Sequence, residues 1–184
     1  VVRAYAGGAG LIRNERRLSA YLFDHRVSTA ASLDAGSTDD YLVTYDGQFI
    51  VTPRQQLDAL RGDDLSVIWT RQPTLVTYGT ALAAQTEDVD QDGTRDIVWV
   101  YPHYSPDSRL ALLSGRTGAT IREWPITHRA SSMAPCPDWN GDGRWDVMVS
   151  ESGWPTDEGR VYVYSLVNGA LVFTTTGTSP GDRL

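Results

Sequence analysis

The stretch Asp88-Val-Asp-Gln-Asp-Gly-Thr-Arg-Asp96 is repeated fifty residues further on as Asp138-Trp-Asn-Gly-Asp-Gly-Arg-Trp-Asp146. Each stretch places short oxygen-bearing side chains at positions 1, 3, 5 and 9, where they can converge on one hard cation. The glycine at position 6 permits the positive φ that a tight loop of this kind needs. The predicted ligands are Asp88, Asp90, Asp92 and Asp96 in one stretch and Asp138, Asn140, Asp142 and Asp146 in the other, with the backbone carbonyls of Thr94 and Arg144 at position 7.

These oxygen donors favour Ca²⁺ over Mg²⁺ or Zn²⁺, because Ca²⁺ accepts about six to eight oxygens in flexible geometry. An EF-hand shares the first six positions, but it requires a Glu at position 12 and then a helix. Position 12 is Trp99 or Val149 here, and both lie in apolar runs typical of strands, which excludes the EF-hand and, equally, a dockerin. A plain polar turn is the remaining alternative. The repeated ligand spacing favours two calcium sites.

A third copy of the pattern, Ser32-Leu-Asp-Ala-Gly-Ser-Thr-Asp-Asp40, precedes the apolar run 41–43 but has no acidic residue at positions 1 and 5. We interpret it as a repeat whose metal site has decayed. We call 32–40, 88–96 and 138–146 the first, second and third loop. Their starts at 32, 88 and 138 give periods of 56 and 50 residues, which are typical of propellers, solenoids or arrays.

The surroundings of each loop predict four short strands per repeat. A small-residue strand precedes the loop, an apolar strand follows it, and a hairpin with a Gly-containing turn comes next. Four strands in roughly 50 residues are typical of a β-propeller blade. The expected strands include 80–84, 97–100, 109–113 and 119–124 around the second loop, 131–134, 147–149, 160–164 and 170–174 around the third, and a pair 48–51 and 65–69 after the first.

The sequence thus predicts an all-β fold of about three and a half blades, each of four antiparallel strands. The repeats are expected at 1–18 (partial), 19–72, 73–127, 128–178 and 179–184 (the start of the next). A closed propeller has about four to eight blades, so we expect an internal piece of a larger propeller. Its end blades would expose apolar faces, which favour self-association or packing against missing parts of the parent chain.

The chain resembles the FG-GAP/VCBS repeat family, found in integrin α-subunit propellers and many bacterial surface proteins. Tyr78-Gly79 stands where the family has Phe-Gly, the second and third loops match its Ca²⁺ loop, and 159–164 matches its following strand. The Gly-Ala-Pro element of the family is reduced to Pro102. The resemblance implies a calcium-binding propeller of a secreted, cell-surface or periplasmic protein that acts in adhesion.

Composition excludes several other classes of protein. The net charge is −7 and there is no basic run, which argues against nucleic-acid binding. No apolar stretch of about 18 residues is present, so no membrane span is expected. The single Cys136 excludes an internal disulfide, and the scattered His25, His103 and His128 have no zinc-site spacing. No nucleophile elbow, phosphate loop or dinucleotide fingerprint occurs, so the chain is not expected to be an enzyme.

Two inter-strand loops contain aromatic residues that can serve as recognition anchors for a protein or glycan ligand. Trp154 lies in one loop, and Tyr101 and Tyr104 lie in the equivalent place of the preceding repeat, where we expect them to be exposed. A solvated loop without a ligand is the plainer alternative. The leading hypothesis is a calcium-stabilised adhesion or binding scaffold. The alternative, from another class, is the non-catalytic propeller part of a secreted hydrolase or polysaccharide lyase.

Overall fold

The computed structural model describes the larger part of the chain. For 2–5, 12–16, 24–25 and 46 it describes the backbone alone. The described residues are 2–5, 12–16, 24–46, 55–73, 81–102, 108–126, 129–151 and 158–178.

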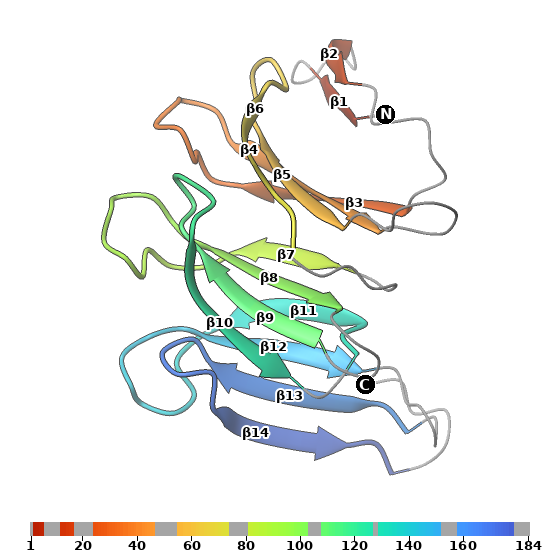
Figure 1. Ribbon diagram of the computed structural model, residues 1–184, viewed down its shortest axis with the longest axis vertical. Helices are drawn as coiled ribbons and strands as arrows, with labels where there is room; N and C mark the ends of the chain where they lie inside the picture. The colour runs from red at the N-terminus through yellow and green to blue at the C-terminus, as the bar shows by residue number, and fades with distance from the viewer. Residues whose placement is uncertain are drawn as a thin grey trace.

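Three four-stranded antiparallel sheets and one two-stranded sheet make up the fold, and the described residues contain no helix (Figure 1). Each four-stranded sheet is a meander in which consecutive strands pair. The two-stranded sheet consists of β1 (Val2–Tyr5) and β2 (Ile12–Arg16). The first four-stranded sheet consists of β3 (Asp24–Ala30), β4 (Asp40–Asp46), β5 (Gln56–Leu60) and β6 (Val67–Arg71), and the second of β7 (Leu82–Gln85), β8 (Ile97–Pro102), β9 (Ser108–Leu113) and β10 (Thr120–Ile126). The third consists of β11 (Ser132–Cys136), β12 (Asp146–Glu151), β13 (Arg160–Ser165) and β14 (Leu171–Thr176).

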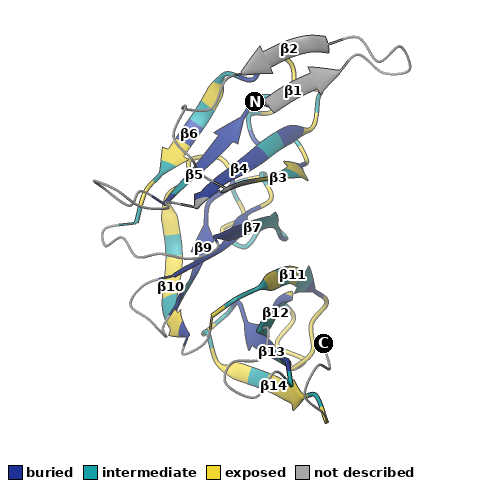
Figure 2. Cartoon of the chain, turned by 90° about the vertical axis from the view of Figure 1, so that its right-hand side faces the viewer, coloured by how far each residue is buried: buried dark blue, intermediate teal, exposed yellow. Residues whose placement is uncertain are grey.

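The expected strand after each loop is confirmed, because the second strand of each four-stranded sheet begins at or directly after position 9 of a loop. All six residues of β8 are buried, which explains why that strand is apolar on both faces. The fourth strands β6, β10 and β14 have mostly exposed or half-buried residues (Figure 2). The sheets therefore bury their middle strands and present their fourth strands towards solvent.

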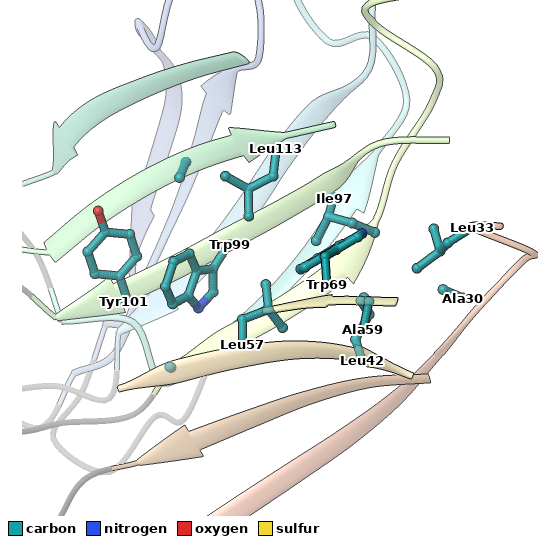
Figure 3. Close-up of a cluster of buried hydrophobic side chains, with 12 residues drawn as sticks. Ala30, Leu33, Leu42, Leu57, Ala59, Trp69, Ile97, Trp99, Tyr101 and Leu113 are labelled. Atoms are coloured by element: carbon teal, nitrogen blue, oxygen red, sulfur yellow. The ribbon is translucent and has the colours of Figure 1, made fainter. Parts of the chain in front are cut away.

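The three four-stranded sheets stack on one another through apolar side chains. One cluster joins β3–β6 to β7–β10 and includes Leu57, Trp69, Ile97 and Trp99 (Figure 3). A second cluster joins β7–β10 to β11–β14. The first strand β7 also contacts the first strands β3 and β11 of the neighbouring sheets, and it contacts β4 as well. The described sheets form an open stack, as neighbouring blades would, and they do not close into a ring.

The turn after the third strand of one sheet receives a side chain from the fourth strand of the preceding sheet. The indole N–H of Trp69 donates to the Gly115 carbonyl at 2.8 Å, and a Cβ on Gly118 would lie 2.7 Å from the Trp69 ring. In the next pair of sheets Trp124 lies against Gly169, where a Cβ would approach its ring to 2.3 Å. These glycines are needed because their turns have positive φ and are covered by an indole.

The all-β prediction and the four-stranded sheets are confirmed, whereas two finer expectations are not. The strand that pairs with 65–69 was expected at 48–51, but β6 pairs with β5 at Gln56–Leu60. That expectation was wrong because β5 contains Gln56 and Asp58, which weaken its apolar pattern, and 48–51 lies outside the described residues. The propeller ring and its blade number remain predictions. In the part of the chain that is described, no helix is long and apolar enough to cross a membrane.

Candidate metal-binding loops

Each loop connects the first strand of a sheet to the second, at the same end of each sheet. The first loop joins β3 to β4, the second joins β7 to β8, and the third joins β11 to β12. All three have a left-handed residue at position 4: Ala35 (φ 64°), Gln91 (φ 61°) and Gly141 (φ 77°). In all three the carboxylate at position 9 is buried and accepts a hydrogen bond from the N–H of position 2. The loops therefore share one backbone design.

The second loop brings three of its predicted ligands together. One carboxylate oxygen from each of Asp88, Asp90 and Asp96 lies within 4.8 Å of the other two, and among the described residues this is the one such group of three acidic, histidine or cysteine side chains. Such a spacing lets three oxygens reach one cation. Burial raises the pKa of Asp96 to about 6, although the N–H groups of Gly115 and Val89 counteract this by donating to its carboxylate.

Asp92, a further predicted ligand of the second loop, adjoins this group, because its backbone N–H donates to Asp88 at 3.2 Å and to Asp90 at 3.1 Å. Asp92 accepts a hydrogen bond from the Thr94 N–H at 2.8 Å, and Asp88 accepts one from the Gly93 N–H at 2.9 Å. Gly93 has a φ of 88°, which confirms the expected positive φ at position 6. Gly143 of the third loop has a φ of 83°. The role of the Thr94 and Arg144 backbone carbonyls as ligands at position 7 stays a prediction.

The third loop is more open than the second. Asp138, Asn140 and Asp142 are exposed, and the Asn140 side-chain amide donates to Asp142 at 2.9 Å. The pKa of Asp138 is lowered by the N–H groups of Gly143 and Gly141, which donate to its carboxylate. Asp146 is fully buried, and its Oδ1 has no hydrogen-bond partner. A buried carboxylate oxygen without a partner is costly, and a bound cation would satisfy it.

The second and third loops also touch each other across the boundary between their sheets. Glu87, directly before Asp88, accepts a hydrogen bond from the backbone N–H of Trp145 at 3.0 Å. The Arg144 guanidinium lies 3.9 Å from the same Glu87 oxygen. An ion that orders one loop would therefore also stabilise a contact between neighbouring sheets.

Sequence reasoning missed one position that belongs to these sites, at the junction between the third strand of a sheet and the turn that follows it: Ser114 comes directly after β9, and Ser165 is the last residue of β13. The hydroxyl of Ser114 lies 3.4 Å from Asp92 Oδ2, and that of Ser165 donates to Asp142 Oδ2 at 2.9 Å. Both serines stand four residues before the turn glycine, at Gly118 and Gly169. That spacing was the available signal, but only the strand pairing shows that the turn lies beside the loop.

The expectation that Tyr101 is exposed is wrong. It lies in β8 with only 5 % of its surface exposed, and its ring centroid is 4.3 Å from that of Trp99. The apolar run 97–100 continues into Pro102 as one strand, which buries Tyr101 between the sheets (Figure 3). Trp154 and Tyr104, the other two predicted anchors, lie outside the described residues.

A small cavity of about 90 Å³ lies beside Tyr101, between β6 and β8–β10. The indole N–H of Trp99 and the Nε of Arg71, both lining residues, are buried without a hydrogen-bond partner. Because one water occupies roughly 30 Å³ in the liquid, the cavity suits a few water molecules, which would satisfy these donors. The metal loops, where carboxylates converge, are the better candidate site.

Comparison with known proteins supports the architecture rather than an activity. No protein-family model matches the chain. Protein FAM234B of Mus musculus is 35% identical over 71 residues, which are 37% of this chain and 11% of that protein. The crystal structure of the rhamnogalacturonan lyase YesW superposes with a TM-score of 0.53 and 13% identity over 86% of this chain and 36% of the lyase. A rhamnogalacturonan lyase of Bacillus licheniformis gives a TM-score of 0.52 and 14% identity over the same shares.

Those shares limit what the likeness shows. The chain spans about a third of each lyase and about a tenth of the mouse protein. At identities of 13% and 14%, the likeness to the two lyases shows the fold alone.

Proposed function

We propose that this chain is a calcium-stabilised scaffold, without a catalytic site of its own, within an extracellular protein that acts on a polysaccharide. The observation that carries the proposal is the convergence of Asp88, Asp90 and Asp96 within 4.8 Å in a loop at the boundary between two sheets. Glu87, next to the second loop, also contacts Trp145 of the third loop, so the two loops meet where β7–β10 packs against β11–β14. A metal ion there would stabilise the stacking of sheets.

Calcium is the ion that these residues fit best. The second loop offers four carboxylates, those of Asp88, Asp90, Asp92 and Asp96, and the third offers three carboxylates and the Asn140 amide. All are hard oxygen donors on a short loop, and neither loop contains a His or Cys, which favours calcium over zinc and copper. Bound Ca²⁺ would neutralise carboxylates that otherwise repel one another. It would also compensate the buried Asp96 and Asp146, whose pKa values burial raises.

The polysaccharide context rests on the two rhamnogalacturonan lyases. Their likeness spans most of this chain, and it spans only about a third of each lyase. A chain that matches one part of a larger enzyme over most of its own length is expected to be a structural part of a larger protein. It favours the non-catalytic part of a polysaccharide lyase over an integrin-like adhesion scaffold.

The calcium proposal is tested by titrating EDTA-treated protein with Ca²⁺ in a calorimeter and by melting it over a range of Ca²⁺ concentrations. We expect two sites, with the tighter one in the second loop because of its extra carboxylate. With a Kd near 10⁻⁴ M and millimolar Ca²⁺, each site would add about 1.4 kcal/mol to the free energy of unfolding. A chain that takes up no Ca²⁺, or melts identically in EDTA and in millimolar Ca²⁺, would contradict the proposal.

The polysaccharide context needs a separate test. In affinity electrophoresis we expect rhamnogalacturonan in the gel to retard the folded, calcium-loaded chain more than a neutral galactan does. Equal mobility in both gels would leave the calcium scaffold standing and remove the polysaccharide assignment.

A binding scaffold for a protein partner is the second candidate function. It is favoured by an exposed aromatic pair at the end of the stack, where Trp139 and Phe173 have ring centroids 5.2 Å apart and are 50% and 41% exposed. Exposed aromatic pairs of this kind are common in protein interfaces. Partner capture that is lost on Trp139→Ser would favour this candidate.

A further inference from the structure

The first loop keeps the backbone of the other two loops but has a different charge at its centre. Asp40 at position 9 is buried and accepts hydrogen bonds from the Leu33 N–H at 2.6 Å and the Gly62 N–H at 2.9 Å. Asp96 of the second loop is held in the same way by Val89 and Gly115. The first loop is therefore closed as tightly as the second, although it has lost two ligands.

The difference lies at the residue where the third strand meets the following turn. That residue is Ser114 or Ser165 in the two complete repeats, and each hydroxyl is directed at the position-5 aspartate of its loop. In the first repeat, position 5 is Gly36 and the residue after the strand is Arg61. An aspartate and a serine have thus been replaced together by a glycine and an arginine.

The guanidinium of Arg61 reaches the centre of the first loop. Its Nε lies 2.5 Å from Asp34 Oδ2, and its Nη1 donates to the Ser66 hydroxyl at 3.0 Å. Asp34 occupies position 3, the place of Asp90 in the acidic group of the second loop. The pKa of Asp34 is lowered, mainly by the hydrogen bond from the Gly36 N–H and next by that from the Arg61 guanidinium. Both contacts therefore favour its ionised form.

We infer that Arg61 is a tethered cation that takes the place of the metal ion in the first loop. Its single charge matches a loop that has lost the carboxylates of positions 1 and 5. A divalent ion bound at Asp34 would also be repelled by the guanidinium. The sheet β3–β6 consequently closes its loop without metal, whereas β7–β10 and β11–β14 depend on it. This inference rests on the proposed calcium binding of the second and third loops.

Hydrogen exchange followed by mass spectrometry tests the inference on the unaltered chain. With calcium at about ten times its Kd, exchange in 88–96 and 138–146 should be about tenfold slower than in EDTA. Exchange in 32–40 should be the same in both buffers. Calcium-dependent protection of 32–40 would overturn the inference. Calcium-independent exchange in all three loops would contradict the calcium proposal, and Arg61→Gln then tests the tethered cation alone, because it should speed exchange in 32–40.

A gain of binding is the complementary test. The triple variant Ser32→Asp, Gly36→Asp, Arg61→Ser gives the first loop the residues of the second, and it should raise the calorimetric stoichiometry from two Ca²⁺ to three. A Cβ on Gly36 would lie 2.8 Å from Asp34 Oδ1, a flexible side-chain end that is free to move once Arg61 is gone.

The matched control keeps the arginine: Ser32→Asp with Gly36→Asp should still bind two ions. Three ions in the control, or two in a triple variant whose circular dichroism is that of the parent, would show that Arg61 does not exclude the metal.

Discussion

At the scale of single residues, the aspartate at position 9 determines how each loop closes. Asp40, Asp96 and Asp146 are each buried and hold the N–H of position 2. Burial raises the pKa of all three, and that of Asp96 to about 6. Keeping these groups ionised at neutral pH is unfavourable unless a cation compensates them. In the second and third loops the metal ion and the buried aspartate therefore depend on each other.

The raised pKa of Asp96 predicts a pH dependence of stability without metal. Its folded pKa of about 6 exceeds its ordinary value of 3.8, so protonated Asp96 stabilises the fold. That contribution is complete below pH 3.8 and is lost as the pH rises through 6. In EDTA we expect the melting temperature to rise from pH 7 to pH 5. The increment due to Ca²⁺ should shrink over the same range, because the ion needs the carboxylate.

Asp96→Asn is the matched variant for this prediction. The neutral amide cannot titrate, so the melting temperature in EDTA should vary less between pH 7 and pH 5 than that of the parent. An unchanged slope would assign the pH dependence to other groups.

At the scale of elements, the turn after each third strand links neighbouring sheets. Its first residue faces a loop, and its glycine lies against an indole of the preceding sheet. The Trp69 indole both covers Gly118 and donates to the Gly115 carbonyl. In the next pair of sheets two residues share these tasks: Arg122 donates a hydrogen bond to the Val167 carbonyl of the turn, and the Trp124 indole covers Gly169. One short turn thus joins a metal loop to the sheet before it.

Two glycines with similar φ should respond differently to alanine. Gly93 has a φ of 88° and nothing within 4 Å of its Cβ position, so Gly93→Ala incurs only backbone strain, about 1 kcal/mol. Gly118 has a φ of 68°, and a Cβ there would lie 2.7 Å from the rigid Trp69 ring.

Gly118→Ala should therefore cost roughly 1–3 kcal/mol more than Gly93→Ala in urea unfolding at saturating Ca²⁺, since the indole must shift. Equal losses would mean that the indole does not pack on this turn.

At the scale of the whole molecule, the described chain is a stack with an unpartnered end. Trp69 opposes Ala59, two residues before Arg61, and is 8% exposed because the next sheet covers it. Phe173 opposes Val163, two residues before Ser165, and is 41% exposed. Phe173 thus stands on β14 at the strand register that Trp69 has on β6, and no described sheet follows β14. The expectation that end faces drive self-association stays a prediction, and Leu171 and Phe173 are the large exposed apolar side chains of β14 through which it can be tested.

The end face predicts concentration-dependent association. Leu171 and Phe173 are 50% and 41% exposed on β14, and burial of exposed apolar area drives contact between copies or with further sheets. Light scattering should show a mean mass that increases with concentration, and Leu171→Ser with Phe173→Ser should reduce that increase. The double change Thr174→Ser with Thr175→Ser on the same strand is the control. A monodisperse parent over the whole range would contradict the prediction.

The sequence by itself was sufficient for everything set by local chemistry. Ligand spacing, turn glycines and apolar runs were enough to predict the loops, most strands and the all-β class, because each depends on neighbours in the chain. It misplaced the partner of β6, because the polar Gln56 and Asp58 interrupt the apolar pattern of β5. The tertiary structure alone decided that Tyr101 is buried, that Ser114 and Ser165 lie beside their loops, and that Arg61 faces Asp34. The contacts of the two serines and of Arg61 join residues 22, 23 and 27 positions apart, whose proximity arises only when the strands pair and the sheets stack.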